Sequence, residues 1–229
     1  MEPKNNKYTA KLAGILYLLW ILLSLYGMFF IPSQISTKGD SSSIAKNILS
    51  HEFIFRTSIL TDILTSTVWL FMVSVLYRLF KSINEHQAKL LVLLVIVQIP
   101  TVFVMEALNF ASLKIFKGEL LNAFELSQRL DLAILFHKMN GYGLLMQELF
   151  WGLWLFPLAI LVYKSGFLPR FLGIWLLLNG IAYIILSCFD LLLPQFRDIV
   201  FKIGFPCFLG EIVFMLWLLI KGAKPSQVI

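Results

Sequence analysis

Residues 149–185 read LFWGLWLFPLAILVYKSGFLPRFLGIWLLLNGIAYII. Two long apolar runs stand on either side of the short break KSGFLPR, and each approaches the roughly 20 residues that a helix needs to cross a bilayer. Gly166 and Pro169 in this break favour a tight turn over a continued helix. The stretch therefore predicts two antiparallel transmembrane helices joined by a handful of residues.

The composition of the whole chain agrees with this interpretation. Of the 229 residues, 59% are hydrophobic and 14% are charged, whereas about 25% are charged in an ordinary soluble domain. The mean hydropathy is +0.84, and the apolar residues form long blocks instead of an amphipathic pattern. A soluble protein of this size could not bury so many apolar blocks. We therefore expect an integral membrane protein that has the lipid bilayer as a partner.

Six segments have the length and composition of membrane spans. They cover approximately residues 10–31, 57–80, 90–113, 139–163, 168–190 and 199–220. Each span has to be a helix, because no water in the bilayer core can satisfy the backbone N–H and C=O groups. The predicted fold is all-α and polytopic, with a single six-helix transmembrane domain over residues 1–229 and no separate soluble domain.

The distribution of lysine and arginine predicts the orientation of the chain. With the N-terminus in the cytoplasm, ten of the 19 basic residues lie at the cytoplasmic ends of the spans. These residues are Lys4, Lys7, Lys11, Arg78, Lys81, Lys89, Lys164, Arg170, Lys221 and Lys224. The cytoplasmic connections are short and the outer ones are long, so the cytoplasmic side is more basic per residue. We expect both termini in the cytoplasm, and we assign the net charge of +6 to topology and not to nucleic-acid binding.

Two predicted outer loops are long enough to contain helices of their own. In the first loop, Ser43 is the predicted N-cap of a short helix that presents Ile44, Ile48 and Leu49 on one side. The second loop covers residues 117–138. Such segments either lie flat on the outer leaflet or fold over the bundle as a lid, and we favour the interfacial arrangement.

Four carboxylic acids lie inside the predicted spans, namely Asp62, Glu106, Glu148 and Glu211. An ionisable side chain at mid-membrane costs roughly 2.5–3.5 kcal/mol on insertion scales, so each acid is a candidate functional residue. Each lies six to ten residues from a basic residue at the outer end of its span, which is roughly 9–15 Å at about 1.5 Å per residue. Four helices therefore place an acid at a similar level in the outer half of the membrane.

Polar side chains accompany these acids on the same helix faces. Lipid cannot satisfy such stripes, so we expect them to face the interior of the bundle. The candidate ligand- or ion-binding residues are Asp62, Glu106, Asn109, Gln147, Glu148, Asn179, Asp190 and Glu211. Without a predicted basic partner at their depth, the acids have to stay protonated or hold a cation. This pattern predicts an acidic pocket that binds or transports a cation, a proton or a small solute.

Two other roles stay open. In the first, each acid is neutral and hydrogen-bonded to a neighbouring helix, and the protein has a structural or interaction role. In the second, the chain is a membrane-embedded enzyme that acts on lipid, with His137 as a candidate metal ligand. The three histidines lack the close spacing of a zinc motif, and no nucleotide-binding signature is present. No cofactor and no oligomeric state are therefore assigned, and an enzymatic role is disfavoured.

Three stretches of the chain resemble one family of proteins. They are residues 149–185, the segment YTAKLAGILYLLW at 8–20 and the segment GEIVFMLWLLIKG at 210–222. In order and spacing they resemble the bacterial membrane-protein family called domain of unknown function 4386, and the resemblance covers nearly the whole chain. It implies a small multi-span protein of the bacterial cytoplasmic membrane and supplies no activity. Glu211 and residues 164–170 lie within the matching motifs.

Overall fold

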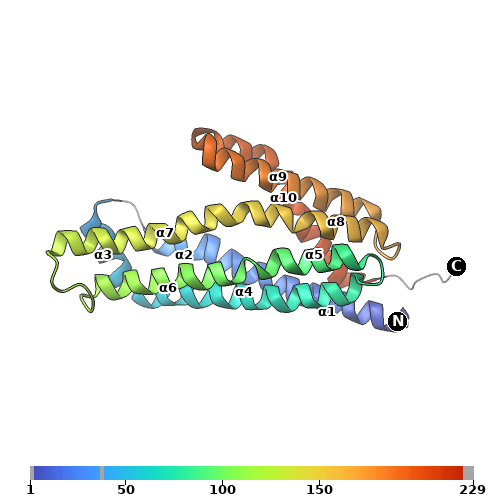
Figure 1. Cartoon of the computed structure of the whole chain (residues 1–229), viewed down its shortest axis with the longest axis horizontal. Coiled ribbons are helices and arrows are strands. Elements are labelled where there is room, and N and C mark those ends of the chain that lie inside the picture. The colour runs from blue at the N-terminus through green and yellow to red at the C-terminus, as the bar shows by residue number, and fades with distance from the viewer. Residues whose placement is uncertain (1–2, 37–38, 224–229) are drawn as a thin grey trace. The chain divides into compact units, whose positions relative to one another are not determined.

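The structure is a computed structural model, and it describes residues 3–36 and 39–223. Within these ranges every regular element is helical (Figure 1). Lys224 and the side chain of Lys4, two of the predicted cytoplasmic basic residues, lie outside the described part of the chain.

Ten α-helices are present in the described residues, together with a π-helical turn (Tyr26–Phe30) and a 3-10 turn (Pro194–Phe196). The helices are α1 (Pro3–Leu25), α2 (Ile31–Gln34), α3 (Ser41–Ser50), α4 (Glu52–Phe80), α5 (Glu85–Ile96), α6 (Ile99–Phe116), α7 (Leu126–Leu153), α8 (Leu155–Lys164), α9 (Arg170–Leu192) and α10 (Arg197–Ile220).

Six stretches of helix in the described residues are long and apolar enough to cross a membrane. They are Asn6–Gln34, Glu52–Phe80, Glu85–Phe116, Leu126–Lys164, Arg170–Leu192 and Pro194–Ile220. The predicted all-α polytopic fold with six spans is therefore confirmed. That the spans form one domain, and that both termini lie in the cytoplasm, stays a prediction.

Two of the spans are interrupted, and a proline explains each interruption. A proline cannot donate a backbone hydrogen bond, and its ring clashes with the carbonyl group four residues earlier. Helices α5 and α7 each end four residues before a proline, Pro100 and Pro157 respectively. At the first interruption, Nε2 of Gln98 donates to the carbonyl oxygen of Leu94 at 2.6 Å. This carbonyl group therefore keeps a hydrogen-bond partner although the helix stops.

The chain forms two compact units. Unit 1 comprises Met1–Leu19, Val68–Gln98 and Leu145–Ile229, and unit 2 comprises Trp20–Thr67 and Ile99–Leu144. Helices α5, α8, α9 and α10 belong entirely to unit 1, whereas α2, α3 and α6 belong entirely to unit 2. The polar residues predicted from the sequence are divided between the two units.

In unit 1, α8 and α9 form the antiparallel pair that the sequence predicts (Figure 1). A Cβ atom on Gly173 of α9 would lie 2.8 Å from the carbonyl oxygen of Ala159 on α8, and one on Gly180 of α9 would lie 2.9 Å from that of Gly152, near the end of α7. The helices approach closely at these positions because glycine has no side chain. The connecting turn contains Gly166 with a φ of +69°, a left-handed conformation that favours glycine.

In unit 2, α3 packs into the core of the unit. Ile44 and Ile48 of α3 are buried in one hydrophobic cluster with Leu113 of α6 and Ile134 of α7. The favoured interfacial arrangement is therefore wrong for this helix, because its apolar face is buried in protein and only Leu49 of the predicted face is exposed. Residues 126–138 of the second outer loop belong to α7.

The N-cap of α3 is Asp40, and the prediction of Ser43 as the cap is wrong. Asp40 precedes the helix in an extended conformation, and its Oδ1 accepts a hydrogen bond from the backbone N–H of Ser43 at 2.9 Å. Ser43 is thus the donor to the cap, because the helix begins two residues before it. Hydrogen bonds from the side chain and backbone of Ser43 lower the pKa of Asp40 below its ordinary value.

The lowered pKa makes the stability of α3 depend on pH. The contribution of Asp40 is present above the ordinary pKa of an aspartate, and it is lost as the pH falls through the lower pKa of the folded state. We expect the protection of residues 41–50 from amide hydrogen exchange, measured relative to the intrinsic rate at each pH, to fall at acidic pH, and to be low at every pH in Asp40→Ala. Asp40→Asn is the matched control, because asparagine caps a helix without titrating. Slow exchange in Asp40→Ala would contradict the capping role.

Candidate functional site

A cluster of polar side chains in unit 2 is centred on Glu106 of α6. The Glu106 side chain is buried, and the residue is 3% exposed. Its Oε1 accepts a hydrogen bond from Nδ2 of Asn140 on α7 at 2.7 Å, and its Oε2 accepts one from Nδ2 of Asn109 at 3.2 Å. Asn109 follows Glu106 by three residues, so the helical period places both on one face of α6.

Asp62 of α4 brings a second carboxyl group to this cluster. The carboxyl groups of Asp62 and Glu106 lie close enough together to interact electrostatically and to share a hydrogen bond when one of them is protonated. Asp62 also lies against Gly27 of the π-helical turn, where a Cβ atom would be 3.4 Å from its Oδ1. A hydrogen bond between two carboxyl groups contains a proton, so the pair carries at most one negative charge. Among the described residues, no lysine or arginine forms an ion pair with either acid.

His137 of α7 extends the hydrogen-bonded chain from Glu106. Its Nδ1 lies 3.0 Å from Oδ1 of Asn109. Because Nδ2 of Asn109 donates to Glu106, its Oδ1 is an acceptor, and Nδ1 of His137 has to carry a hydrogen. The His137 ring packs on Phe55 with the ring centroids 5.7 Å apart. Asp62, Glu106, Asn109 and His137 thus form one connected chain.

A pocket of about 370 Å³ in unit 2 reaches this chain. Its lining residues are Ile44, Ile134, His137, Lys138, Asn140, Gly141 and Tyr142. Two of them, His137 and Asn140, also belong to the polar cluster, because they bond to Asn109 and Glu106. The pocket therefore meets the buried acids through side chains that can pass on a hydrogen bond.

The candidate metal role of His137 finds no support in this geometry. In the part of the chain that the structure describes, no three or more His, Cys, Asp and Glu side chains are grouped so as to hold a metal ion. His137 is instead bonded through Nδ1 to an amide oxygen. The neighbours of the acids in unit 2 are amides, which suit hydrogen bonding to a carboxyl group.

In unit 1, Glu148 and Asp190 are bound by an arginine. Nε of Arg197 lies 2.7 Å from Oδ1 of Asp190, and a terminal guanidinium nitrogen lies 3.2 Å from Oε1 of Glu148. The expectation that the four intramembrane acids lack a basic partner is therefore wrong for Glu148. The reason is the short 3-10 turn between α9 and α10, which brings Arg197 at the start of α10 back to the end of α9. The sequence contained one signal of this contact, because Arg197 follows Asp190 by only seven residues.

Glu211 of α10 lies in a separate set of contacts within unit 1. The hydroxyl group of Tyr17 donates to its Oε1 at 2.5 Å, and Nδ2 of Asn179 donates to its Oε2 at 3.3 Å. All three side chains are buried. Both donors are neutral, so this carboxyl group has hydrogen-bond partners and no ion-pair partner in the described residues.

Helix α9 contributes polar residues both to the contacts of Glu211 and to those of Arg197. Tyr183 follows Asn179 by one turn and is close enough to interact electrostatically with both Glu211 and Glu148. Asp190 lies two turns further along the helix. Gln147, next to Glu148 on α7, is buried as well.

The structure thus brings Asp62, Glu106 and Asn109 together in unit 2, and Glu148 and Asp190 together in unit 1. A single chamber that contains all four intramembrane acids stays a prediction.

These features define a six-span helical membrane protein with buried acidic clusters. The chain belongs to the family described as Domain of unknown function (DUF4386), which matches residues 12–222. An uncharacterized protein of Archaeoglobus fulgidus is 43% identical over 81 residues, which are 35% of this chain and 47% of that protein. The chain thus matches about half the length of this relative. No solved structure matches the chain.

Proposed function

We propose that the protein binds a proton at the Asp62–Glu106 pair and couples this binding to a small polar solute in the adjacent pocket. The observation that carries the proposal is a buried Glu106 that accepts hydrogen bonds from two amides, lies next to the carboxyl group of Asp62 and has no basic partner in the described residues. This is the narrower form of the predicted role in binding or transporting a cation, a proton or a small solute.

The Asp62–Glu106 pair can bind and release one proton. Two adjacent carboxylates in a poorly hydrated site cannot both ionise, so one proton is held until water or a cation reaches the pair. Glu148 and Asp190 are also close to each other, but Arg197 compensates one of their two possible negative charges. An arginine stays protonated at any physiological pH, so this cation favours the ionised form of the carboxyl groups beside it. The pair in unit 2 is therefore the better candidate for reversible protonation.

The pocket favours a proton over a metal cation. Lys138 lines it, and its positive charge opposes the entry of another cation. A proton can instead pass along hydrogen-bonded side chains, and the His137 ring has one nitrogen that donates to Asn109 and a second that can accept a proton. The pocket volume of about 370 Å³ suits a small molecule, and Lys138, His137 and Asn140 offer it hydrogen bonds.

We also propose a location for the protein. The family resemblance and the distribution of basic residues support the cytoplasmic membrane of a bacterial cell, with both termini in the cytoplasm. In this orientation the Asp62–Glu106 pair lies in the outer half of the bilayer. Reporter fusions after residue 36 and after residue 223 test the proposal, because the first fusion point is then outside the cytoplasm and the second inside it.

Infrared spectroscopy of the purified chain in lipid tests the proton site directly. We expect a carbonyl band of protonated carboxyl groups at neutral pH, where exposed carboxyl groups are ionised. Glu106→Gln and Asp62→Asn should each remove part of this band, because either change removes one partner of the shared proton. Glu85→Gln is the matched control, since Glu85 is exposed and bonded to Lys89. A band whose intensity is the same in both variants as in the wild type would refute the proposal.

A further inference from the structure

We propose that the end of the α8–α9 hairpin binds an anionic phospholipid, whose phosphate group contacts Lys164 and Arg170 and whose acyl chain enters the groove between the two helices. The site shares no residue with the Asp62–Glu106 pair. The inference therefore does not depend on the proposed function.

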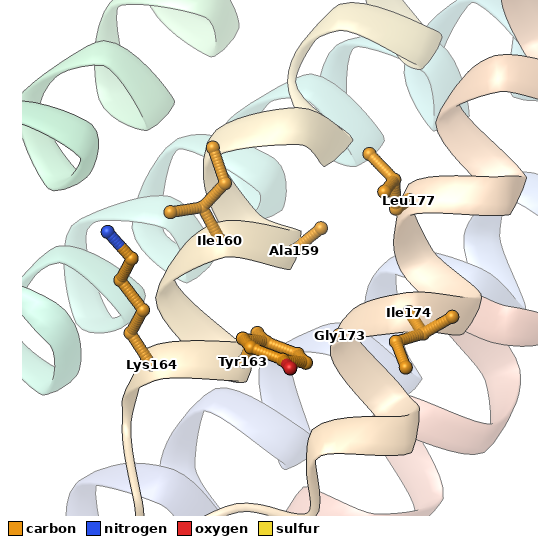
Figure 2. Close-up of a pocket in the computed structure, with 7 residues that line it drawn as sticks. All are labelled: Ala159, Ile160, Tyr163, Lys164, Gly173, Ile174 and Leu177. Atoms are coloured by element: carbon orange, nitrogen blue, oxygen red, sulfur yellow. The ribbon is translucent and has the colours of Figure 1, made fainter.

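The groove between α8 and α9 is about 270 Å³ in volume and lies within unit 1. Figure 2 shows its lining residues, which are Ala159, Ile160, Tyr163 and Lys164 of α8 and Gly173, Ile174 and Leu177 of α9. Apart from Lys164 and the hydroxyl group of Tyr163, these side chains are apolar. Ile174 and Leu177 are 50% and 37% exposed, so a hydrocarbon chain can reach them.

Two positive charges lie at one end of this groove. Lys164 is the last residue of α8 and Arg170 is the first residue of α9, so both lie where the chain leaves its apolar spans. Both are exposed, and neither forms an ion pair among the described residues. The guanidinium carbon of Arg170 lies 5.4 Å from the ring centroid of Tyr163, which holds this charge beside the groove.

The charge at this end is complementary to a lipid phosphate. Basic residues that end a span lie at the level of the headgroups, where each attracts an anionic lipid. The adjoining groove is apolar, so it suits the acyl chain of the same molecule. A zwitterionic lipid fits the groove equally well but has no net charge to offer Lys164 and Arg170. The arrangement therefore predicts selectivity for an anionic headgroup.

A second groove in unit 1 can be compared with the α8–α9 groove as a site for an anionic lipid. It lies between α4 and α5, has a volume of about 480 Å³ and is lined by Ser74, Tyr77, Arg78, Lys89, Val92, Leu93 and Ile96. It also contains a tyrosine and two basic residues. Here, however, Nζ of Lys89 lies 3.0 Å from Oε1 of Glu85, so a carboxylate already balances one of the charges. Although this groove is larger, its attraction for an anionic headgroup should be weaker.

Native mass spectrometry of the full chain in mild detergent tests the site. Phosphatidylglycerol and phosphatidylcholine are added at equal concentration, and the bound fraction of each is measured. We expect wild-type protein to prefer phosphatidylglycerol, and Lys164→Gln with Arg170→Gln to lower its affinity about fivefold for each charge removed. The matched control is Arg78→Gln with Lys89→Gln, which also removes two charges and should have the smaller effect.

A variant that fills the groove tests the acyl-chain contact separately from the phosphate contact. We expect Ile174→Trp, which places a large side chain in the groove, to weaken binding of both lipids while leaving the preference for phosphatidylglycerol. All of these positions are exposed, so the variants should keep the helical circular dichroism of the wild type. Equal losses in the two double variants would overturn the proposal, because the effect would then be one of general charge. Unchanged lipid binding in Ile174→Trp would overturn the assignment of the groove.

Discussion

Replacing Arg197 by alanine should destabilise the protein by about 2 kcal/mol. The change leaves Glu148 and Asp190 buried next to each other without a cation. Breaking a fully buried ion pair costs about 3–5 kcal/mol, whereas an exposed pair contributes about 0–1 kcal/mol. The side chain of Arg197 is 49% exposed, so an intermediate value is expected. The measurement is the thermal unfolding midpoint of the purified protein in detergent.

Two further variants test whether charge causes this effect. Lys202→Ala removes an exposed cation from the same helix and should leave the unfolding midpoint nearly unchanged. Adding Asp190→Asn and Glu148→Gln to Arg197→Ala removes both uncompensated carboxylates, so it should restore part of the lost stability. If the single variant is as stable as the wild type, the three residues do not form a stabilising network.

Replacing Glu106 by glutamine should reduce proton flux across proteoliposomes by at least about tenfold, which corresponds to 1.4 kcal/mol. Glutamine can still accept a hydrogen bond from Asn140, but it cannot bind or release a proton. The flux is driven by a potassium diffusion potential and followed with a pH-sensitive dye inside the liposomes. Glu106→Gln changes no formal charge if Glu106 carries the shared proton, so the fold should be preserved.

Glu85→Gln is the matched control for the flux experiment. Glu85 is exposed at the start of α5, and its substitution should leave the flux at the wild-type level. Equal flux from wild type and Glu106→Gln would exclude Glu106 from the route. Wild-type liposomes that conduct no more than empty ones would reject proton transport in the absence of a solute, and the infrared band would then test proton binding alone.

The fold was predictable because it depends on properties that are local in the sequence. A membrane span is defined by the length and hydropathy of one segment, so all six could be placed without knowing their neighbours. The tight turn at Gly166 and Pro169 is likewise a local signal. The docking of α3 was not predictable, because an apolar face on a short helix fits a lipid surface and a protein core equally well. Only the packed structure shows Ile44 and Ile48 in a core.

The candidate site was predictable in part for the same reason. Helical spacing placed Asn109 on the face of Glu106, and the structure has them hydrogen-bonded. The partner of an acid on another helix depends on how the helices pack, which the sequence does not show. The sequence therefore did not show that Asn140 donates to Glu106, or that His137 is bonded to Asn109 and not to a metal. Arg197 was missed because a basic residue at the end of a span looks like a topology signal.

The hydrogen bond from Gln98 to Leu94 has a consequence for the backbone of the third span inside the bilayer. A helix that stops inside a bilayer normally exposes carbonyl groups that demand water or a neighbouring helix. Here the carbonyl oxygen of Leu94 is occupied by a side chain from the same joint, at 2.6 Å. The Leu94 carbonyl group is therefore satisfied within the third span itself, and it needs neither water nor a side chain from another helix.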